Sequence, residues 1–211
     1  MRVLLAGFGP FPGAPFNPSA ALMQRLARRR RPALAGLSRH EHIFATSYAA
    51  VDRDLPKLFA DKPDIVLVFG LAARRRHVCI ETRARNLVSV LFPDASRYRP
   101  TDPVIALEGP RARYGRAPFP QLIGAMRAAK VPARTSRDAG RYLCNYVYWR
   151  ALERADEAGP LVQFVHIPAI SRKPRPRYRS RRLSKPPPPS LGKLTAAAER
   201  LLIALVAASR R

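Results

Sequence analysis

The sequence predicts an α/β fold, a three-layer α/β/α sandwich around a mainly parallel central sheet. Apolar, β-branched runs alternate along the chain with segments of helical spacing. The run IVLVF at 65–69 is apolar at every position, which is typical of a strand covered on both faces. With 211 residues and 47% hydrophobic content, the chain can bury one sizeable core. We therefore expect a single domain over residues 1–211.

Strands and helices alternate in the first third of the chain. Arg2–Ala6 is an apolar run that ends in the Gly- and Pro-rich stretch GFGPFPGAPFNPS, which predicts a strand followed by a functional loop. Asn17 precedes a helical pattern that starts near Ser19, so we expect it to be the N-cap. The other elements expected here are a strand at 42–46, a helix at 51–60 and the strand at 65–69.

Residues 70–118 carry several prolines and only short alternating pieces, such as Val78–Ile80 and Leu87–Leu91. We expect an irregular excursion from the sheet that carries a hairpin. Alternation then returns, with a helix at 121–129, a strand at 133–136, a helix at 143–157, a strand at 162–167 and a C-terminal helix at 191–208. The stretch 172–189 is rich in Arg, Pro and Ser, which predicts a basic surface loop.

The chain has 39 Lys and Arg against 14 Asp and Glu, a formal net charge of +25. Such a surface attracts polyanions whether or not this is its function. Nucleic-acid binders usually interleave aromatic residues with the basic ones, and Tyr178 is the only aromatic residue in the basic run 172–182. We expect non-specific polyanion binding, and a basic nucleic-acid-binding module stays open as an alternative.

Cys79 and Cys144 are the only cysteines, too few for a disulfide framework, which favours a reducing compartment. The N-terminus has only a short apolar run, unlike a signal peptide, and no segment approaches the roughly 20 apolar residues that cross a bilayer. We expect a cytoplasmic protein that does not engage a membrane. The sequence leaves open a homo-oligomer, either a dimer or a tetramer.

Three reactive side chains fall near the ends of expected strands, where α/β domains gather reactive groups. Cys144 is expected in the first turn of a helix, whose free N–H groups and dipole favour a thiolate. His166 ends a strand and could take up the thiol proton, and Glu81 stands in the excursion and could orient the imidazole. Spacing alone also fits a packed cysteine, a scaffold histidine and a solvated glutamate.

Four stretches of sequence share a common resemblance. They are LLAGFGPFPG followed by NPS, VFGLAARRRHVCIETRARN, RTSRDAGRYLCNYVYW and FVHIPAI. They resemble motifs of pyroglutamyl peptidase type I, a family of cytosolic cysteine exopeptidases (thiol proteases). The third resembles the family's Ser-(Asn or Asp)-(Thr or Asp)-Ala-Gly-x-Tyr-(Val or Leu)-Cys-Asn. The likeness covers Arg2 to about Ile170 and returns over 189–208.

The resemblance implies hydrolysis of the amide bond after an N-terminal pyroglutamyl residue of peptides, through a thioester acyl-enzyme and without a metal or organic cofactor. It assigns the nucleophile to Cys144, the base to His166 and the orienting carboxylate to Glu81. From acyl-transfer chemistry, we expect an oxyanion hole made by backbone N–H groups near Cys144 at the helix start and by the loop at 7–9. The substrate-binding residues that the resemblance implies are Phe8, Phe11, Phe16, Asn17, Leu71, Tyr142 and Leu143.

Several positions depart from the family pattern. Gly9 stands in place of an acidic residue, Pro12 in place of a glycine, Ala73 and Arg74 in place of a Gly-Gly pair, and Leu91 where the family tends to have arginine. The basic insert 172–185 is not a family feature. These departures leave open a divergent member with weak or altered acyl-hydrolase activity. Cys79 is interpreted as structural.

Overall fold

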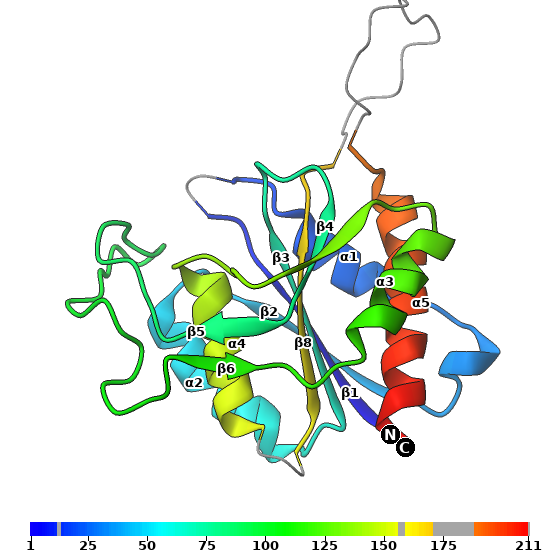
Figure 1. Cartoon of the computed structure of the whole chain (residues 1–211), viewed down its shortest axis with the longest axis horizontal. Coiled ribbons are helices and arrows are strands. Elements are labelled where there is room, and N and C mark those ends of the chain that lie inside the picture. Colours follow the sequence, from blue (N-terminus) through cyan, green and yellow to red (C-terminus); the bar gives the residue numbers. More distant parts are fainter. Residues whose placement is uncertain (12–13, 156–158, 171–187, 211) are drawn as a thin grey trace, which may run out of the picture.

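The computed structural model describes residues 1–11, 14–155, 159–170 and 188–210. A six-stranded sheet forms its centre, in the order β2-β1-β3-β8-β4-β7, with helices on both faces (Figure 1). The strands are β1 (Arg2–Phe8), β2 (Ser38–Phe44), β3 (Ile65–Leu71), β4 (Val78–Glu81), β7 (Ala133–Ser136) and β8 (Leu161–Ile167). Neighbouring strands are parallel except β4 against β8. The expected three-layer α/β fold is confirmed.

Alternate residues along the strands bury against two different helical layers, as the two-residue period of a strand requires. One layer holds α1 (Pro18–Ala27), α3 (Phe119–Ala128) and α5 (Leu191–Ser209). The other layer holds α2 (Tyr48–Ala60) and α4 (Leu143–Arg154). A short 3-10 helix, η1, spans Pro32–Leu34. None of the described helices is both long enough and apolar enough to span a membrane.

A second, two-stranded sheet pairs β5 (Arg83–Arg85) antiparallel with β6 (Ala112–Tyr114) and lies beside α4 (Figure 1). This is the expected hairpin excursion, but its extent differs from the prediction. Val78–Ile80 lies in β4 of the central sheet. Leu87–Leu91 forms no strand, because its backbone is held by single contacts with distant loops, from Val88 N to Pro103 O and from Ser89 N to Arg141 O.

The predicted helix cap is confirmed. The Asn17 side chain accepts a hydrogen bond from Ser19 N at 3.1 Å, and the helix begins at Pro18. The second strand begins at Ser38, earlier than expected, because at this sheet edge its polar residues lie in solvent and mask the strand pattern. Pro12, residues 156–158 and most of the basic stretch 172–189 lie outside the described residues.

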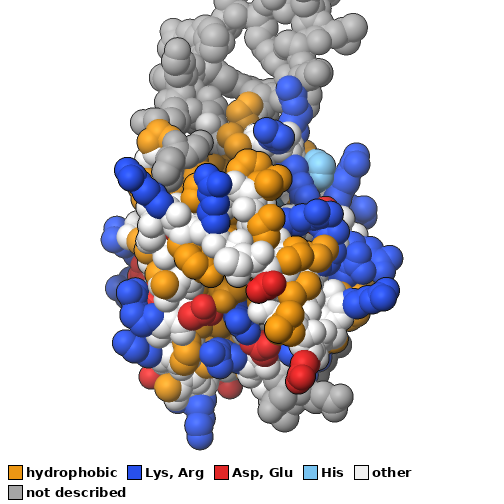
Figure 2. Space-filling model, turned by 90° about the vertical axis from the view of Figure 1, so that its left-hand side faces the viewer, with side chains coloured by type: hydrophobic (Ala, Val, Ile, Leu, Met, Phe, Trp, Pro, Cys, Tyr) orange, Lys and Arg blue, Asp and Glu red, His pale blue; other side chains and the backbone are white. Residues whose placement is uncertain are grey.

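The segment 86–111 lies on the left of Figure 1, and Figure 2 shows that side of the molecule, with basic side chains scattered among apolar ones. Several of its large apolar side chains are exposed, namely Val90 (38%), Leu91 (71%), Phe92 (64%), Tyr98 (54%) and Leu107 (83%). Its polar anchor is the buried Asn86, whose Oδ1 accepts hydrogen bonds from the backbone N–H groups of Ile105 and Ala106, both at 2.9 Å. The segment is therefore fixed at its base, while the five large apolar side chains named above face solvent.

Candidate active site

His166 and Glu81 form a buried pair, with His166 Nδ1 2.8 Å from Glu81 Oε1. The exposed fraction is 5% for His166 and 0% for Glu81. Glu81 was expected in the excursion at the same sheet edge as the strand ends, and this placement is wrong. It ends β4, which runs antiparallel to β8 with Cys79 opposite His166. Residues i and i+2 of a strand share a face, so Glu81 points to the face that carries His166.

Cys144 is the second residue of α4, at the helix start that the sequence predicted. Its sulfur lies against Gly70, because a Cβ built on Gly70 would be 3.0 Å from Cys144 Sγ. Gly70 is in turn the register partner of His166 in the β3·β8 pairing. The Cys144 side chain lies close enough to His166 to raise the pKa of the imidazole through charge and hydrogen bonding. The structure therefore brings thiol, imidazole and carboxylate together on the α4 face of the sheet.

The imidazole of this group carries a proton at neutral pH. Burial by itself lowers the pKa of His166, but the negative charges of Cys144 and Glu81 and its hydrogen bonds to both raise that pKa to about 9. Since a carboxylate can only accept, Nδ1–H donates to Glu81 and Nε2 is left for the sulfur. A protonated imidazole beside a cysteine is the arrangement that favours a thiolate–imidazolium pair in cysteine nucleophiles in general.

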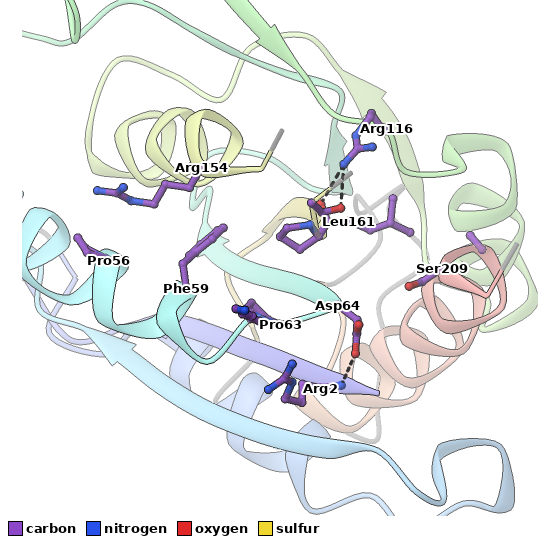
Figure 3. Close-up of a pocket in the computed structure, with 13 residues that line it drawn as sticks. Arg2, Pro56, Phe59, Pro63, Asp64, Arg116, Arg154, Leu161 and Ser209 are labelled. Atoms are coloured by element: carbon purple, nitrogen blue, oxygen red, sulfur yellow. Dashed lines mark hydrogen bonds between the residues drawn. The ribbon is translucent and has the colours of Figure 1, made fainter. Parts of the chain in front are cut away.

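A large cavity lies at the other end of the sheet, where β1, β3 and β8 begin (Figure 3). Its volume is about 960 Å³, and its lining includes Arg2, Asp64, Arg116, Arg154 and Leu161. None of Glu81, Cys144 and His166 lines it. The described residues also contain no group of three or more His, Cys, Asp or Glu placed to hold a metal ion. The thiol site and this cavity are therefore separate features of the fold.

Comparison with known proteins identifies the family. A sequence profile described as pyroglutamyl peptidase matches residues 1–211. The chain belongs to the pyroglutamyl peptidase family. The pyrrolidone-carboxylate peptidase of Thermococcus onnurineus is 33% identical over 183 residues, covering 83% of this chain and 90% of the relative. That of Chromobacterium violaceum is 32% identical over 169 residues, covering 80% of this chain and 78% of the relative.

Solved structures of pyrrolidone carboxyl peptidases share the fold. The Fervidobacterium islandicum enzyme has a TM-score of 0.83 at 30% identity, covering 98% of this chain and 99% of that chain. The Thermococcus litoralis enzyme has a TM-score of 0.84 at 27% identity, covering 98% and 93%. The mainly parallel sheet is thus a property of the pyroglutamyl peptidase family.

The substrate-binding residues expected from the family resemblance lie at the ends of β1 and β3 and the start of α4. Phe8 and Leu143 are core residues, 3% and 1% exposed, and the Phe8 ring packs against Phe44 and Phe164. The Asn17 amide binds within the protein, with Nδ2 donating to Gly9 O at 3.2 Å. The other four retain exposed surface, namely Phe11, Phe16, Leu71 and Tyr142.

Two further residues of this pyroglutamyl peptidase shape the site without having been predicted. Asn145 is fully buried, and its side chain binds Arg85 N, Arg85 O and Leu87 O at 2.8–2.9 Å. It joins the Cys144 helix to β5. Arg75 contacts Glu81 directly, with Nη1 3.1 Å from Oε1. The sequence signal for Asn145 was its place directly after Cys144, as in the family's Cys-Asn pattern.

Proposed function

We propose that Cys144, His166 and Glu81 are the nucleophile, the base and the orienting carboxylate of this peptidase. The chain is a thiol exopeptidase that removes pyroglutamate from the N-terminus of peptides. The observation that carries the assignment is the convergence at one place of a helix-start thiol, an imidazole and a fully buried carboxylate, with 2.8 Å between His166 Nδ1 and Glu81 Oε1. This is the geometry that nucleophilic acyl transfer requires.

The reaction would proceed in two steps. The Cys144 thiolate attacks the pyroglutamyl carbonyl, and the C–N bond breaks as His166 gives its proton to the departing amine. The product of this step is a thioester and a peptide shortened by one residue. Neutral His166 then takes a proton from water, which attacks the thioester and releases pyroglutamate. Glu81 holds Nδ1–H throughout and stabilises the imidazolium.

The developing oxyanion would be bound at the start of α4. This helix has no side-chain cap, and the first backbone N–H groups of a helix have no partner within it. The loop at 7–9, expected to contribute, is already engaged: Phe8 N donates to Ser19 Oγ and Gly9 N to Phe44 O, both at 3.0 Å. The α4 N–H groups next to Cys144 are therefore the proposed donors.

Recognition of the substrate would exclude a charged N-terminus. The pyroglutamyl lactam is neutral and compact, whereas burial of an unpaired ammonium is costly. We assign the apolar contacts of the ring to Phe11, Phe16, Leu71 and Tyr142, which lie around the strand ends with exposed surface. We assign a supporting role to Phe8, Asn17 and Leu143, because all three are buried and the Asn17 amide is hydrogen-bonded to Gly9 O.

The test is hydrolysis of a fluorogenic pyroglutamyl amide. Cys144→Ala should abolish turnover, and Glu81→Gln should retain partial activity, roughly 1–10% of wild type, because an orienting group is worth less than the nucleophile. Iodoacetamide should inactivate the enzyme with a single adduct on Cys144, since burial raises the pKa of the Cys79 thiol. Equal turnover by wild type and Cys144→Ser would disprove the assignment, as would an adduct on Cys79 that tracks inactivation.

We further infer a cytoplasmic location, because the two cysteines are free in the structure, and a single peptidase domain over residues 1–211. Cell fractionation and limited proteolysis test these points.

Polyanion binding would follow from the charge of +25 and should weaken steeply with salt, without a preferred sequence. A nanomolar, sequence-specific optimum would favour a nucleic-acid-binding role instead. Light scattering decides between a monomer, a dimer and a tetramer.

A further inference from the structure

We propose that Arg75 is a positioning residue of this peptidase, which fixes the Glu81 carboxylate on His166 and, through the same guanidinium, fixes the segment that leads into the Cys144 helix. The proposal rests on the function proposed above. It extends the three-residue site to a guanidinium that acts through the Glu81 carboxylate. Its basis is a set of contacts that join three segments of the chain.

Arg75 lies in the turn between β3 and β4, where its backbone N–H donates to Ala72 O at 2.9 Å. Nη1 donates to Glu81 Oε1 at 3.1 Å and to Ser136 Oγ at 3.3 Å. Nη2 donates to the Asp138 carbonyl at 2.9 Å. The planar fork of a guanidinium can hold several acceptors in fixed directions, which an ammonium cannot do. The three segments therefore depend on one rigid group.

The Glu81 carboxylate needs a second partner to keep one orientation. Its terminal torsion is broad, so a single hydrogen bond leaves the two oxygens free to exchange. Oε1 accepts from both His166 and Arg75, while Oε2 has no hydrogen-bond partner among the described residues. The side chain is 0% exposed, and a buried carboxylate requires positive partners. Arg75 is the partner whose charge does not change during the reaction.

The same guanidinium also contacts the segment that connects β7 to the Cys144 helix. Ser136 ends β7, and Asp138 lies in the short connection from β7 to α4. Asp138 Oδ1 accepts from Gly140 N at 3.0 Å, and Gly140 has φ +88°, a backbone conformation that favours glycine. The chain thus turns sharply just before the helix that carries Cys144. By binding the Asp138 carbonyl, Arg75 links the position of this turn to that of Glu81.

The charged and titratable groups beside Arg75 lie on β4 or directly before it. Glu81 and the Cys79 thiol face it from β4, and His77 precedes that strand. Burial opposes the charge of Arg75, but its hydrogen bonds and charge interactions with Cys79 and Glu81 raise its pKa. Across the site, Cys144 and Glu81 face His166. Arg75 is thus a permanent cation beside a carboxylate whose other partner exchanges protons.

The experiment compares Arg75→Gln and Arg75→Lys with Arg74→Gln and Arg76→Gln, which remove the same charge from exposed neighbours in the same turn. The readouts are kcat and KM for a pyroglutamyl amide, and the pH dependence of Cys144 alkylation by iodoacetamide. We expect Arg75→Gln to lower kcat on the order of 10- to 100-fold with KM changed less than about twofold. In this variant, alkylation of Cys144 should set in at a higher pH than in wild type. The imidazolium that stabilises the thiolate would then no longer be held by an oriented carboxylate. Arg75→Lys should lie between.

The outcomes separate this inference from the proposed function. If Arg75→Gln has the same kcat as Arg74→Gln and its Cys144 is alkylated from the same pH upwards, the positioning role is wrong, whatever the activity of wild type. If wild type itself does not cleave the amide, the proposed function fails, while the alkylation profiles still decide the role of Arg75. Should Arg75→Gln not fold, Arg75→Lys keeps the charge, and wild-type kcat and alkylation in that variant would overturn the proposal.

Discussion

Gly70 leaves the space that the Cys144 sulfur occupies. A Cβ at this position would lie 3.0 Å from Cys144 Sγ and 2.7 Å from Phe164 Cζ, distances too short for carbon against sulfur or an aromatic ring. Gly70 also pairs with His166 across β3 and β8. The absence of a side chain here is therefore part of how thiol and imidazole come into contact.

We expect Gly70→Ala to lower kcat strongly, about 100-fold or more, because a displacement near 1 Å at the reacting atoms has this effect. Gly124→Ala is the matched control. Gly124 is an exposed residue of α3 where a Cβ would meet nothing within 4 Å, so this change should leave kcat unaltered and raise stability by roughly 0.5–1 kcal/mol. Steady-state kinetics and thermal unfolding check both. Wild-type kcat in Gly70→Ala would show that the sulfur does not need this space.

The sequence predicted the parts of the site that depend on local pattern. The helix start at Cys144 and the strand ending at His166 follow from periodicity and from turn residues within a few positions. The direction of β4 was not predictable in this way. Val78–Glu81 is a run of only four residues, and such a run is equally consistent with a hairpin outside the sheet. Its place beside β8 is set by pairing with residues more than 80 positions away.

The conformation of the 86–111 segment was not predicted, for a related reason. Its conformation depends on two buried amides, Asn86 and Asn145, whose hydrogen bonds span about 20 and 60 positions in sequence. An asparagine in a helix pattern or after a short strand carries no information about such distant partners. Local propensity therefore predicted an irregular segment but not what holds it.

The raised pKa of His166 predicts a pH-dependent stability. The pKa is about 9 in the folded protein and about 6.5 in an unfolded chain. Between these values the folded state binds more protons, so the stabilisation is complete below about pH 6.5 and is lost as the pH rises through about 9. The unfolding equilibrium constant should rise by up to about tenfold per pH unit in this window.

Urea unfolding at a series of pH values measures this slope. His166→Asn should remove it, whereas His40→Asn, at an exposed position of β2, should keep it. The use of two histidine variants with the same loss of an imidazole separates the buried pair from the general charge of the protein. A slope that persists in His166→Asn would assign the pH dependence to other groups.

Asn145→Ala should destabilise the protein and slow catalysis together. The change removes hydrogen bonds to Arg85 N, Arg85 O and Leu87 O and leaves buried backbone groups unpaired, at a cost of about 2–4 kcal/mol. Since Asn145 directly follows Cys144, the loss also loosens the helix start, and kcat should fall. Asn86→Ala is the comparison, because it frees the 105–109 backbone but not α4. Denaturant unfolding and kcat should show similar instability in both variants but a larger kcat loss in Asn145→Ala.

Residues 89–93 of the 86–111 segment lie next to the start of α4, the helix that carries Cys144. Ser89 N donates to Arg141 O at 2.6 Å, and the Tyr142 hydroxyl donates to Pro93 O at 2.9 Å. Leu91, between these anchors, is 71% exposed. By resemblance, the pyroglutamyl peptidase family tends to have arginine at this position, so the substitution removes a cation from the surroundings of the reacting group.

We expect Leu91→Arg to raise kcat/KM for a pyroglutamyl amide by about two- to tenfold, because a cation near the site stabilises the negative charge that develops on the carbonyl oxygen. Stability should change by less than about 0.5 kcal/mol, since the side chain is in solvent. Leu107→Arg adds the same charge at a position that is 83% exposed and should have no such effect. The gain should shrink with added salt, because exposed charges are screened over about 10 Å at 0.1 M. If both variants change kcat/KM equally, the effect belongs to net charge, and the leucine at position 91 has no bearing on the chemistry.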